Sequence, residues 1–367
     1  MKWFDLHCDT LTACEEQKLS MRSNHQTQLD FVRLREAGAL AQCFAVFIDR
    51  RACEQRGVSP WKRYEELRDF FFEEIEKSGD IIRRTGTAEE LADAEADGRV
   101  GAVLTVEGGE LLLDGTCDAC GSGAANPVSD AAADAGNPMS DCAMADAGNS
   151  MSDAADAGNP KSVPETLYQR LDRMWSDGVR MLTLTWNYEN CLGYPNGREG
   201  GLKRAGFEAA AYMQELGMIV DVSHLSDQGF FDVINMAGKP VAASHSCARS
   251  LCAHPRNLTD EQLRAIGENG GVVGVNFHAP FLKENGVSGS VEEVARHLEH
   301  IINCAGSAAA ALGSDYDGIP EQPEWGNGEG MPHLLEALSK RFGAHMMDNI
   351  CYKNALRLFT SCSDKNA

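Results

Sequence analysis

Long apolar runs are missing from this sequence. No stretch approaches the roughly 18 consecutive apolar residues that a membrane-spanning helix needs, and the first residues, MKWFDLHC, lead straight into a strand-like pattern instead of the apolar core of a secretory signal. The last residues, SCSDKNA, are polar and offer no tail to exchange for a lipid anchor. We therefore expect a cytoplasmic protein with no membrane partner.

Positive charge is also scarce. The 367 residues include 33 Lys and Arg against 55 Asp and Glu, a formal net charge of −22, and no basic stripe offsets this excess. Nucleic acid is therefore not expected as a partner. The 13 cysteines are an odd number, scattered through apolar segments such as AQCFAVF. This favours buried thiols in a reducing compartment over a disulfide framework.

Large apolar side chains are almost absent from one segment, residues 114–161. It repeats the units NPVSDAAADAG, NPMSDCAMADAG and NSMSDAADAG, and it holds eight Asp against one Lys. Such units bury too little surface to offset the entropy lost on ordering, so we expect a mobile acidic insertion that interrupts a single domain spanning 1–367. Calcium binding is the alternative, although the spacing is not that of an EF-hand loop. The pair Cys117 and Cys120 is weak evidence for zinc or redox chemistry.

Outside that segment, short apolar runs alternate with amphipathic stretches. Eight runs are typical of buried parallel strands: 3–8, 39–48, 101–108, 179–187, 217–224, 240–246, 270–277 and 309–318. Helix-like segments lie between them, for example 162–178 and 290–306, which open on a serine and close on a glycine. The alternation predicts an α/β fold, a (β/α)8 TIM barrel with the acidic insertion after its third strand. A doubly wound sheet is the alternative, but the GxGxxG and Walker A loops typical of such sheets are absent.

Groups that bind metals or move protons stand at the ends of these runs. They are His7 and Asp9 after the first run, Glu107 after the third, His224 after the fifth, His245 after the sixth and Asp315 after the eighth. Taken singly, each is more typical of a hydrogen-bonded structural group. In a barrel, however, the carboxyl ends of the strands converge on one face, so these residues should meet in one pocket. Burying their carboxylates together would be costly without a cation.

The ligand set contains nitrogen and oxygen but needs no thiolate. It suits Zn²⁺ first, with Mn²⁺ or Co²⁺ as substitutes. Three histidines with two carboxylates exceed what one tetrahedral zinc requires, which indicates two ions sharing a carboxylate. Two ions ~3.5–4 Å apart hold a bridging hydroxide at neutral pH and polarise a scissile carbonyl.

At these residues the chain resembles a known family. The motifs DLHCDT, VEGGE, LTLTWN, IVDVSH, SHSCARSLCAHPRNLTD, GGVVGVNF and GSDYDG occur in order from residue 4 to about residue 320. They resemble the membrane (renal) dipeptidases, which are zinc dipeptidases with TIM barrels of the metal-dependent hydrolase type in the amidohydrolase superfamily. HxD on the first strand, in place of the commoner HxH, is a mark of this family. The acidic repeat has no counterpart in it.

The resemblance implies a role for each matched residue. His7 and Asp9 would hold one zinc, His224 and His245 the other, and Glu107 would bridge the two; Asp315 would move the proton, and Arg256 would pair with the free carboxylate of the substrate. Asp317 and Asp221 would support these groups. Where mammalian members have a histidine beside the reacting carbonyl, this chain has Trp186 followed by Asn187. We expect Asn187 to contact the substrate there.

The predicted function is that of a binuclear zinc dipeptidase. It would hydrolyse the amide bond of small dipeptides, including those with a D-residue at the C-terminal position, which the resemblance implies. The first alternative is a related amidohydrolase acting on an N-acyl amino acid or a lactam. A metal-dependent scaffold that works through its acidic repeat and a mononuclear deaminase are further alternatives. Homo-oligomerisation stays open.

Overall fold

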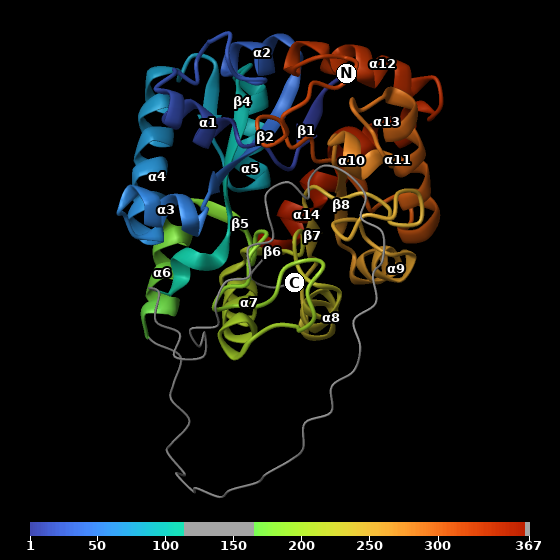
Figure 1. Ribbon diagram of the computed structural model, residues 1–367. Helices are drawn as coiled ribbons and strands as arrows, with labels where there is room; N and C mark the ends of the chain where they lie inside the picture. Colours follow the sequence, from blue (N-terminus) through green and yellow to red (C-terminus); the bar gives the residue numbers. More distant parts are fainter. Residues whose placement is uncertain (114–164, 364–367) are drawn as a thin grey trace, which may run out of the picture.

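The computed structural model describes residues 1–113 and 165–363 of the chain (Figure 1). The acidic repeat, with Cys117 and Cys120, lies outside the described residues, so the expectations for it stay predictions. Within the two described ranges, no helix combines the length and the apolar character needed to cross a membrane.

Eight parallel strands form a closed barrel. They are β1 (Trp3–Asp5), β2 (Ala39–Phe47), β4 (Val100–Glu107), β5 (Val179–Thr183), β6 (Ile219–Asp221), β7 (Ala242–Ala243), β8 (Val272–Val275) and β9 (Ala310–Leu312). Their order is β2-β1-β9-β8-β7-β6-β5-β4, and a pairing between β2 and β4 closes the ring. This closure confirms the predicted TIM barrel and excludes the doubly wound sheet. Each of the eight predicted runs coincides with one of these strands, and only β4 begins outside its run, by one residue.

A ninth strand, β3 (Ile82–Arg84), lies outside the ring. It pairs only with the first residues of β4, where Ile82 faces Val100, along the edge that β5 takes over from Leu104 onward. The sequence prediction missed β3 because its three residues, IRR, include two arginines and give no apolar run.

Helices surround the barrel, as Figure 1 shows. They are α1 (Thr10–Gln17), α2 (Phe31–Glu36), α3 (Arg50–Arg56), α4 (Pro60–Lys77), α5 (Ala88–Ala96), α6 (Glu165–Ser176), α7 (Arg204–Leu216), α8 (Asp227–Met236), α9 (Asp260–Asn269), α10 (Ala279–Leu282), α11 (Val291–Ala305), α12 (Met331–Ser339), α13 (Ala344–Asp348) and α14 (Asn354–Ser363). Short 3-10 turns cover Gly109–Leu112 and Gly328–Gly330, and a π-helical turn, Asn349–Lys353, precedes α14.

Local sequence explains where the helices begin. At α11, the Ser290 hydroxyl accepts from the Glu293 backbone N–H at 3.2 Å, and the Glu293 carboxylate accepts from the Ser290 N–H at 3.3 Å. This capping box satisfies two N–H groups that the helix cannot pair itself, and it confirms the helix predicted over 290–306. Helix α6 confirms the other predicted helix from Glu165 onward; the predicted cap, Ser162, lies outside the described residues.

The last helix closes one end of the barrel. A core cluster joins buried side chains from all eight barrel strands, among them Phe4 on β1, with Leu358 and Phe359 on α14. The rings of Phe4 and Phe359 stack with centroids 5.3 Å apart. Because Ile219, Ala242 and Val272 of this cluster are the first residues of β6, β7 and β8, α14 covers the amino ends of the strands. The opposite face, where the strands end, is left for the polar side chains.

Candidate metal centre and active-site pocket

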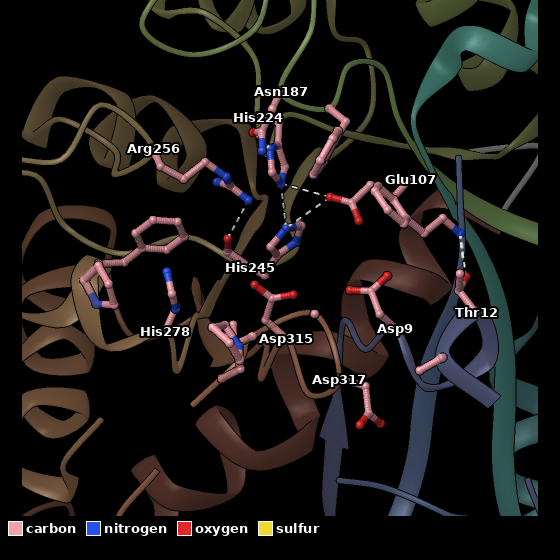
Figure 2. A pocket seen from close by; sticks show the side chains of 18 of the residues that line it. Asp9, Thr12, Glu107, Asn187, His224, His245, Arg256, His278, Asp315 and Asp317 are labelled. Atoms are coloured by element: carbon pink, nitrogen blue, oxygen red, sulfur yellow. Dashed lines mark hydrogen bonds and ion pairs between the residues drawn. The ribbon is translucent and has the colours of Figure 1, made fainter. Parts of the chain in front are cut away.

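A cavity of about 680 Å³ opens where the barrel strands end. Seven predicted site residues line it: Asp9, Glu107, Asn187, His224, His245, Arg256 and Asp315. The eighth, His7, is 2% exposed and stacks against the His245 ring with centroids 3.8 Å apart. Figure 2 shows Arg256 and His278 on one side of the pocket and Asp9, Glu107 and Thr12 on the other, with His245 and Asp315 between them. The structure thus gathers residues from strands up to 300 positions apart, as the barrel predicts.

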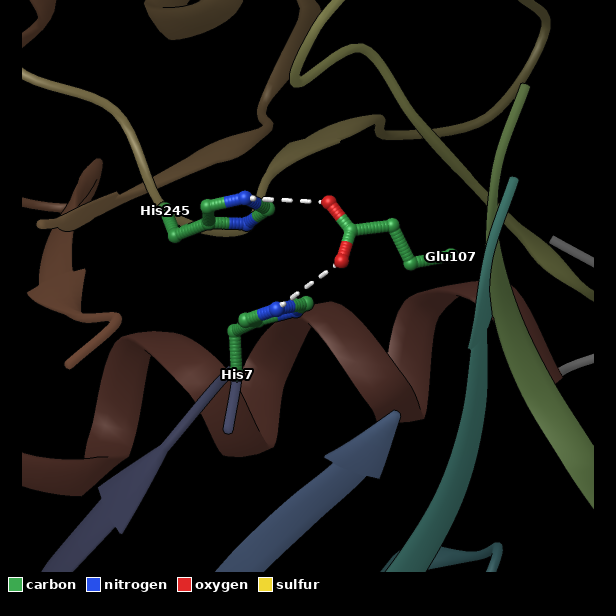
Figure 3. A group of neighbouring side chains, drawn as sticks. All are labelled: His7, Glu107 and His245. Carbon is green, nitrogen blue, oxygen red and sulfur yellow. Dashed lines mark ion pairs between the residues drawn. The ribbon is translucent and has the colours of Figure 1, made fainter. Parts of the chain in front are cut away.

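Glu107, the last residue of β4, lies at the centre of the three imidazoles. Its Oε1 is 2.9 Å from His224 Nε2 (Figure 2). The same oxygen is 3.4 Å from His245 Nε2, while its Oε2 is 3.4 Å from His7 Nε2 (Figure 3). The two oxygens of one carboxylate therefore face different ligand groups. His7 Nε2 also lies 3.4 Å from Asp9 Oδ2 and 3.7 Å from Asp315 Oδ1.

Several buried polar atoms of this cluster lack hydrogen-bond partners among the described residues. They include His7 Nε2, Asp9 Oδ1 and Glu107 Oε1. In addition, the Nε2 atoms of His224 and His245 are only 3.0 Å apart, so both cannot carry a proton toward each other. Unpaired buried polar atoms are costly. Nitrogen and oxygen atoms that converge without partners fit a zinc-type cation, which would satisfy them together.

The surrounding charges set the protonation of the imidazoles. Burial lowers the pKa of His224 to about 4, and the positive charge of Arg256 adds to this. Burial and the neighbouring His7 hold the pKa of His245 well below its ordinary value. Burial acts in the same direction on His7, but the neighbouring carboxylates of Glu107 and Asp9 together outweigh it and raise the pKa of His7 well above the ordinary value. His224 and His245 are therefore neutral imidazoles, the form that binds metals.

A buried aspartate orients the His245 ring. Asp221 Oδ2 accepts from the hydroxyls of Ser244 at 2.5 Å and Thr183 at 2.6 Å, and Asp221 Oδ1 accepts from the Ser244 N–H at 2.9 Å. Because the Ser244 hydroxyl donates to this carboxylate, its oxygen accepts from His245 Nδ1, 2.7 Å away. The proton then sits on Nδ1, and the Nε2 lone pair is free for a metal. The chain places Asp221 as a support, which agrees with the expectation from the sequence.

A second aspartate–serine pair joins β1 to β9. Asp5 Oδ1 accepts from the Ser314 N–H at 2.7 Å, and Asp5 Oδ2 accepts from the Ser314 hydroxyl at 2.5 Å. Ser314 directly precedes Asp315, and Asp5 stands two positions before His7, so this pair fixes two site residues on neighbouring strands. Sequence reasoning missed Asp5, Ser244 and Ser314. The available signal was a serine directly before a site residue, as in SH and SD.

Unusual backbone conformations occur beside the centre. His224, Asp315 and Asp317 have φ angles of 66°, 64° and 67°, in the left-handed region that L-residues rarely adopt. Such strain persists only where the surrounding structure enforces it. Gly318 allows close approach in the same loop, because a Cβ there would lie 2.2 Å from Asp9 Oδ2.

Asn187 and Trp186 occupy the pocket in different ways. Asn187 Oδ1 lies 3.0 Å from His224 Nδ1 and accepts its proton, so Asn187 orients His224 much as Ser244 orients His245. Its expected contact with substrate stays a prediction. Trp186 packs its ring against Phe47, with centroids 4.8 Å apart, and both line the cavity.

Arg256 is buried at the far side of the pocket, with 4% exposure. Its NH1 donates to the Ser246 hydroxyl and its NH2 to the His245 carbonyl, both at 3.0 Å, while Nε has no partner among the described residues. His278 also lines the cavity, with Nδ1 2.7 Å from Glu321 Oε1. Sequence reasoning treated His278 as an ordinary histidine because nothing in its local pattern distinguishes it.

Asp317 lines the cavity, but its carboxylate is hydrogen-bonded to neighbouring protein groups. Its Oδ2 accepts from the Thr10 hydroxyl at 2.6 Å, and its Oδ1 accepts from the Gln28 N–H at 2.6 Å. The Gln28 side-chain oxygen accepts in return from the Asp317 N–H at 2.6 Å. Asp317 therefore ties the loop that carries Asp315 to the segment before α2.

A closed (β/α)8 barrel with imidazoles and carboxylates gathered at its strand ends defines a metal-dependent hydrolase. The sequence matches the model of the family described as membrane dipeptidase, peptidase family M19, over residues 1–118 and 161–366. The chain belongs to this family, as its motifs predicted, and is an enzyme of the metal-dependent dipeptidase class.

Other proteins resemble the chain over parts or all of its length. An uncharacterized protein in the pqqA 5′ region of Klebsiella pneumoniae is 38% identical over 200 residues, covering 51% of this chain and 74% of that protein. An uncharacterized dipeptidase of Schizosaccharomyces pombe is 39% identical over 164 residues, covering 42% of this chain and 39% of that protein.

Solved structures share the fold. The dipeptidase AC, a family M19 metallopeptidase, superposes with a TM-score of 0.79 at 23% identity, covering 99% of both chains. A metallopeptidase from Rhodobacter sphaeroides, bound to a phosphinate mimic of the dipeptide L-Ala-D-Ala, gives a TM-score of 0.77 at 22% identity over 98% of both chains.

Proposed function

We propose that the protein is a binuclear zinc dipeptidase that hydrolyses the amide bond of dipeptides. The observation that carries this proposal is the position of Glu107, whose two oxygens face two different groups of ligand atoms. His7 and Asp9 would hold one ion, His224 and His245 the other, and Glu107 would bridge them. Two such ions supply a nucleophile at neutral pH and polarise the scissile carbonyl.

Asp315 is the group we assign to proton transfer. Its Oδ2 accepts from Asn276 Nδ2 at 2.8 Å, while its Oδ1 faces His7. Burial raises the pKa of Asp315, although the positive charge of His7 opposes this. A carboxylate of raised pKa accepts a proton from the attacking water and returns it to the leaving amine, which general acid–base catalysis requires.

The preference for a short substrate follows from the positions of Arg256 and of the proposed metal ligands on opposite sides of the pocket. Arg256, with an unpartnered buried Nε, would pair with the C-terminal carboxylate of the substrate. Arg256 lies on the side of the pocket opposite the carboxylates of Asp9 and Glu107 (Figure 2), so a substrate held by Arg256 would present the amide bond nearest its C-terminus to the proposed ligands. The L-Ala-D-Ala mimic bound by the Rhodobacter sphaeroides protein supports including a D-residue at the C-terminal position.

Metal analysis with a substrate panel tests this function. We expect about two zinc ions per chain, and turnover of dipeptides in preference to N-acyl amino acids and lactams. One ion per chain would contradict the binuclear centre. Cleavage of N-acyl amino acids without cleavage of dipeptides would favour the related amidohydrolase. We also propose that residues 114–161 interrupt one catalytic domain, so a chain that lacks them should still hydrolyse dipeptides.

Asp315→Asn tests the proton-transfer role. The amide oxygen can still accept from Asn276, so zinc content should stay near two per chain while kcat falls roughly a hundredfold or more. Asp317→Asn is the matched control, because it lies in the same loop but hydrogen-bonds only to structural partners. It should lower stability and leave kcat nearly unchanged. Equal losses of kcat in the two variants would remove Asp315 from the mechanism.

A further inference from the structure

A second cluster of ligand-type side chains lies outside the barrel, between α9 and α11. His300 and Cys304 project from α11, and Asp260 stands at the first position of α9. His300 Nε2 is 2.8 Å from Asp260 Oδ1 and 3.4 Å from Cys304 Sγ. These atoms all lie within 4.8 Å of one another. None of the three residues belongs to the active-site pocket, which is lined by other side chains.

His300 Nε2 has more polar neighbours in this cluster than it can form hydrogen bonds with. Besides Asp260 and Cys304, the Ser250 hydroxyl lies 2.9 Å from His300 Nε2. A neutral imidazole nitrogen offers either one proton or one lone pair, so it cannot bond to an acid, a hydroxyl and a thiol together. A cation at the meeting point of the nitrogen, the sulfur and the carboxylate oxygen would use all three at once.

The spacing also suits a tetrahedral ion. Zinc bonds of about 2.0 Å to nitrogen and 2.3 Å to sulfur place neighbouring ligand atoms about 3.3–3.5 Å apart. The His300–Cys304 distance of 3.4 Å agrees with this, and the His300–Asp260 distance of 2.8 Å would have to open by about half an ångström. Residues four apart share one helix face, so HIINC presents a nitrogen and a sulfur side by side.

The site is accessible to solvent. His300 also lines a separate cavity of about 260 Å³, together with Arg296 and Glu299. The side chains of His300 and Asp260 are 23% and 39% exposed, so an ion can enter without unfolding the helices.

We propose that Cys304, His300 and Asp260 bind a divalent ion of the zinc type at a site separate from the catalytic centre, one that fills only when metal is added beyond the two catalytic equivalents. Binding replaces the S–H bond of Cys304 by a sulfur–metal bond and releases one proton to solvent. Ser250 lies between His245 and Arg256 in the chain. The Ser250 hydroxyl donates to Asp260 Oδ1 at 2.9 Å, so an ion held by Asp260 and His300 would fix the segment that carries Arg256 to α11, a structural effect.

Cobalt substitution gives a direct test, because a thiolate bound to Co²⁺ absorbs in the near ultraviolet and the catalytic ligands include no sulfur. The full-length protein, with Cys117 and Cys120 both replaced by serine to remove that pair, is loaded with two equivalents of zinc and then titrated with Co²⁺. We expect the thiolate band to grow with one further equivalent. Cys304→Ser in this background should abolish the band while dipeptide turnover stays nearly unchanged, and its thermal midpoint should no longer rise with the third equivalent of metal.

Two outcomes would overturn the proposal. The first is no thiolate band in the parent protein, and the second is a band of equal strength in Cys304→Ser. Alkylation of Cys304 gives an independent check. Added Zn²⁺ should slow the alkylation of Cys304 at least about tenfold, as measured by mass spectrometry of the peptide that contains it. His300→Asn should remove that protection. Equal alkylation with and without Zn²⁺ would contradict the site.

Discussion

Replacing Ser244 by alanine tests whether the Asp221–Ser244–His245 chain prepares His245 for metal binding. The variant loses the bond to Asp221 Oδ2 at 2.5 Å and the acceptor for His245 Nδ1 at 2.7 Å. A hydrogen bond to a charged group contributes about 1.5–3 kcal/mol, so stability should fall by about that amount. Loss of a partner that orients a ligand typically weakens metal binding 10- to 100-fold, equivalent to about 1.4–2.7 kcal/mol.

The assay is removal of zinc by a competing chelator, with bound zinc per chain measured at each concentration. The wild-type protein should lose its two ions at high chelator, whereas Ser244→Ala should lose one of them at about 10- to 100-fold lower chelator concentration. The other ion, for which we propose His7 and Asp9 as ligands, should be released nearly as in the wild type.

Ser314→Ala is the matched control. Its hydroxyl makes the same 2.5 Å bond to a buried aspartate, Asp5, and reaches His7 only at the backbone carbonyl, 3.2 Å away, not at the imidazole ring. It should therefore lower stability to a similar extent and change zinc affinity less than threefold or so. If Ser244→Ala and Ser314→Ala weakened zinc binding equally, the orientation of His245 would not be the cause, and the reasoning would fail.

Three further predictions concern substrate binding, pH dependence and metal removal. Arg256→Lys should raise KM for dipeptides about 10- to 100-fold with little change in kcat, because lysine cannot pair with a carboxylate in two places; steady-state kinetics would refute this if kcat fell instead. Burial raises the pKa of Glu110 from 4.5 to about 7, so the folded state binds a proton more tightly than the unfolded chain, and stability falls as pH rises from 4.5 to 7. Glu110→Gln should therefore be more stable than wild type at pH 8, by up to about 3 kcal/mol, and nearly equal to it at pH 4.5 in urea titrations; equal gains at both pH values would refute the assignment. Chelation should abolish turnover and lower the thermal midpoint, and added Zn²⁺ should restore both; full activity without metal would contradict the proposed centre.

The barrel could be predicted because its signal is local. Each strand is a short apolar run bounded by turn residues, and eight such runs alternating with helices leave few architectures. The meeting of His7, Glu107 and Asp315 followed from the same reasoning, since the carboxyl ends of parallel strands share one face. The structure places them within hydrogen-bond or ion-pair distance, although their metal-binding roles stay a prediction.

The hydrogen-bond partners of these residues could not be predicted from the sequence in the same way. Asp5 and Asp221 each stand on a strand shortly before a site histidine, yet each bonds to a serine on a neighbouring strand, 309 and 23 positions away. Such contacts depend on strand register, which composition and periodicity do not determine. Asn187 illustrates the same limit: its place after LTLT indicated the pocket, but its bond to His224 appears only in three dimensions.

Strand order explains why a single glutamate stands between the ligand groups. Strands β1 and β9 are neighbours, as are β6 and β7, and β8 separates the two pairs. One pair supplies His7, Asp9 and Asp315, and the other supplies His224 and His245, each pair locked by one aspartate and one serine. β4 adjoins neither pair, because β2 and β5 intervene on its two sides. A side chain from β4 must therefore extend inward toward both strand pairs. The side chain of glutamate is longer than that of aspartate, and its carboxylate directs one oxygen toward each strand pair.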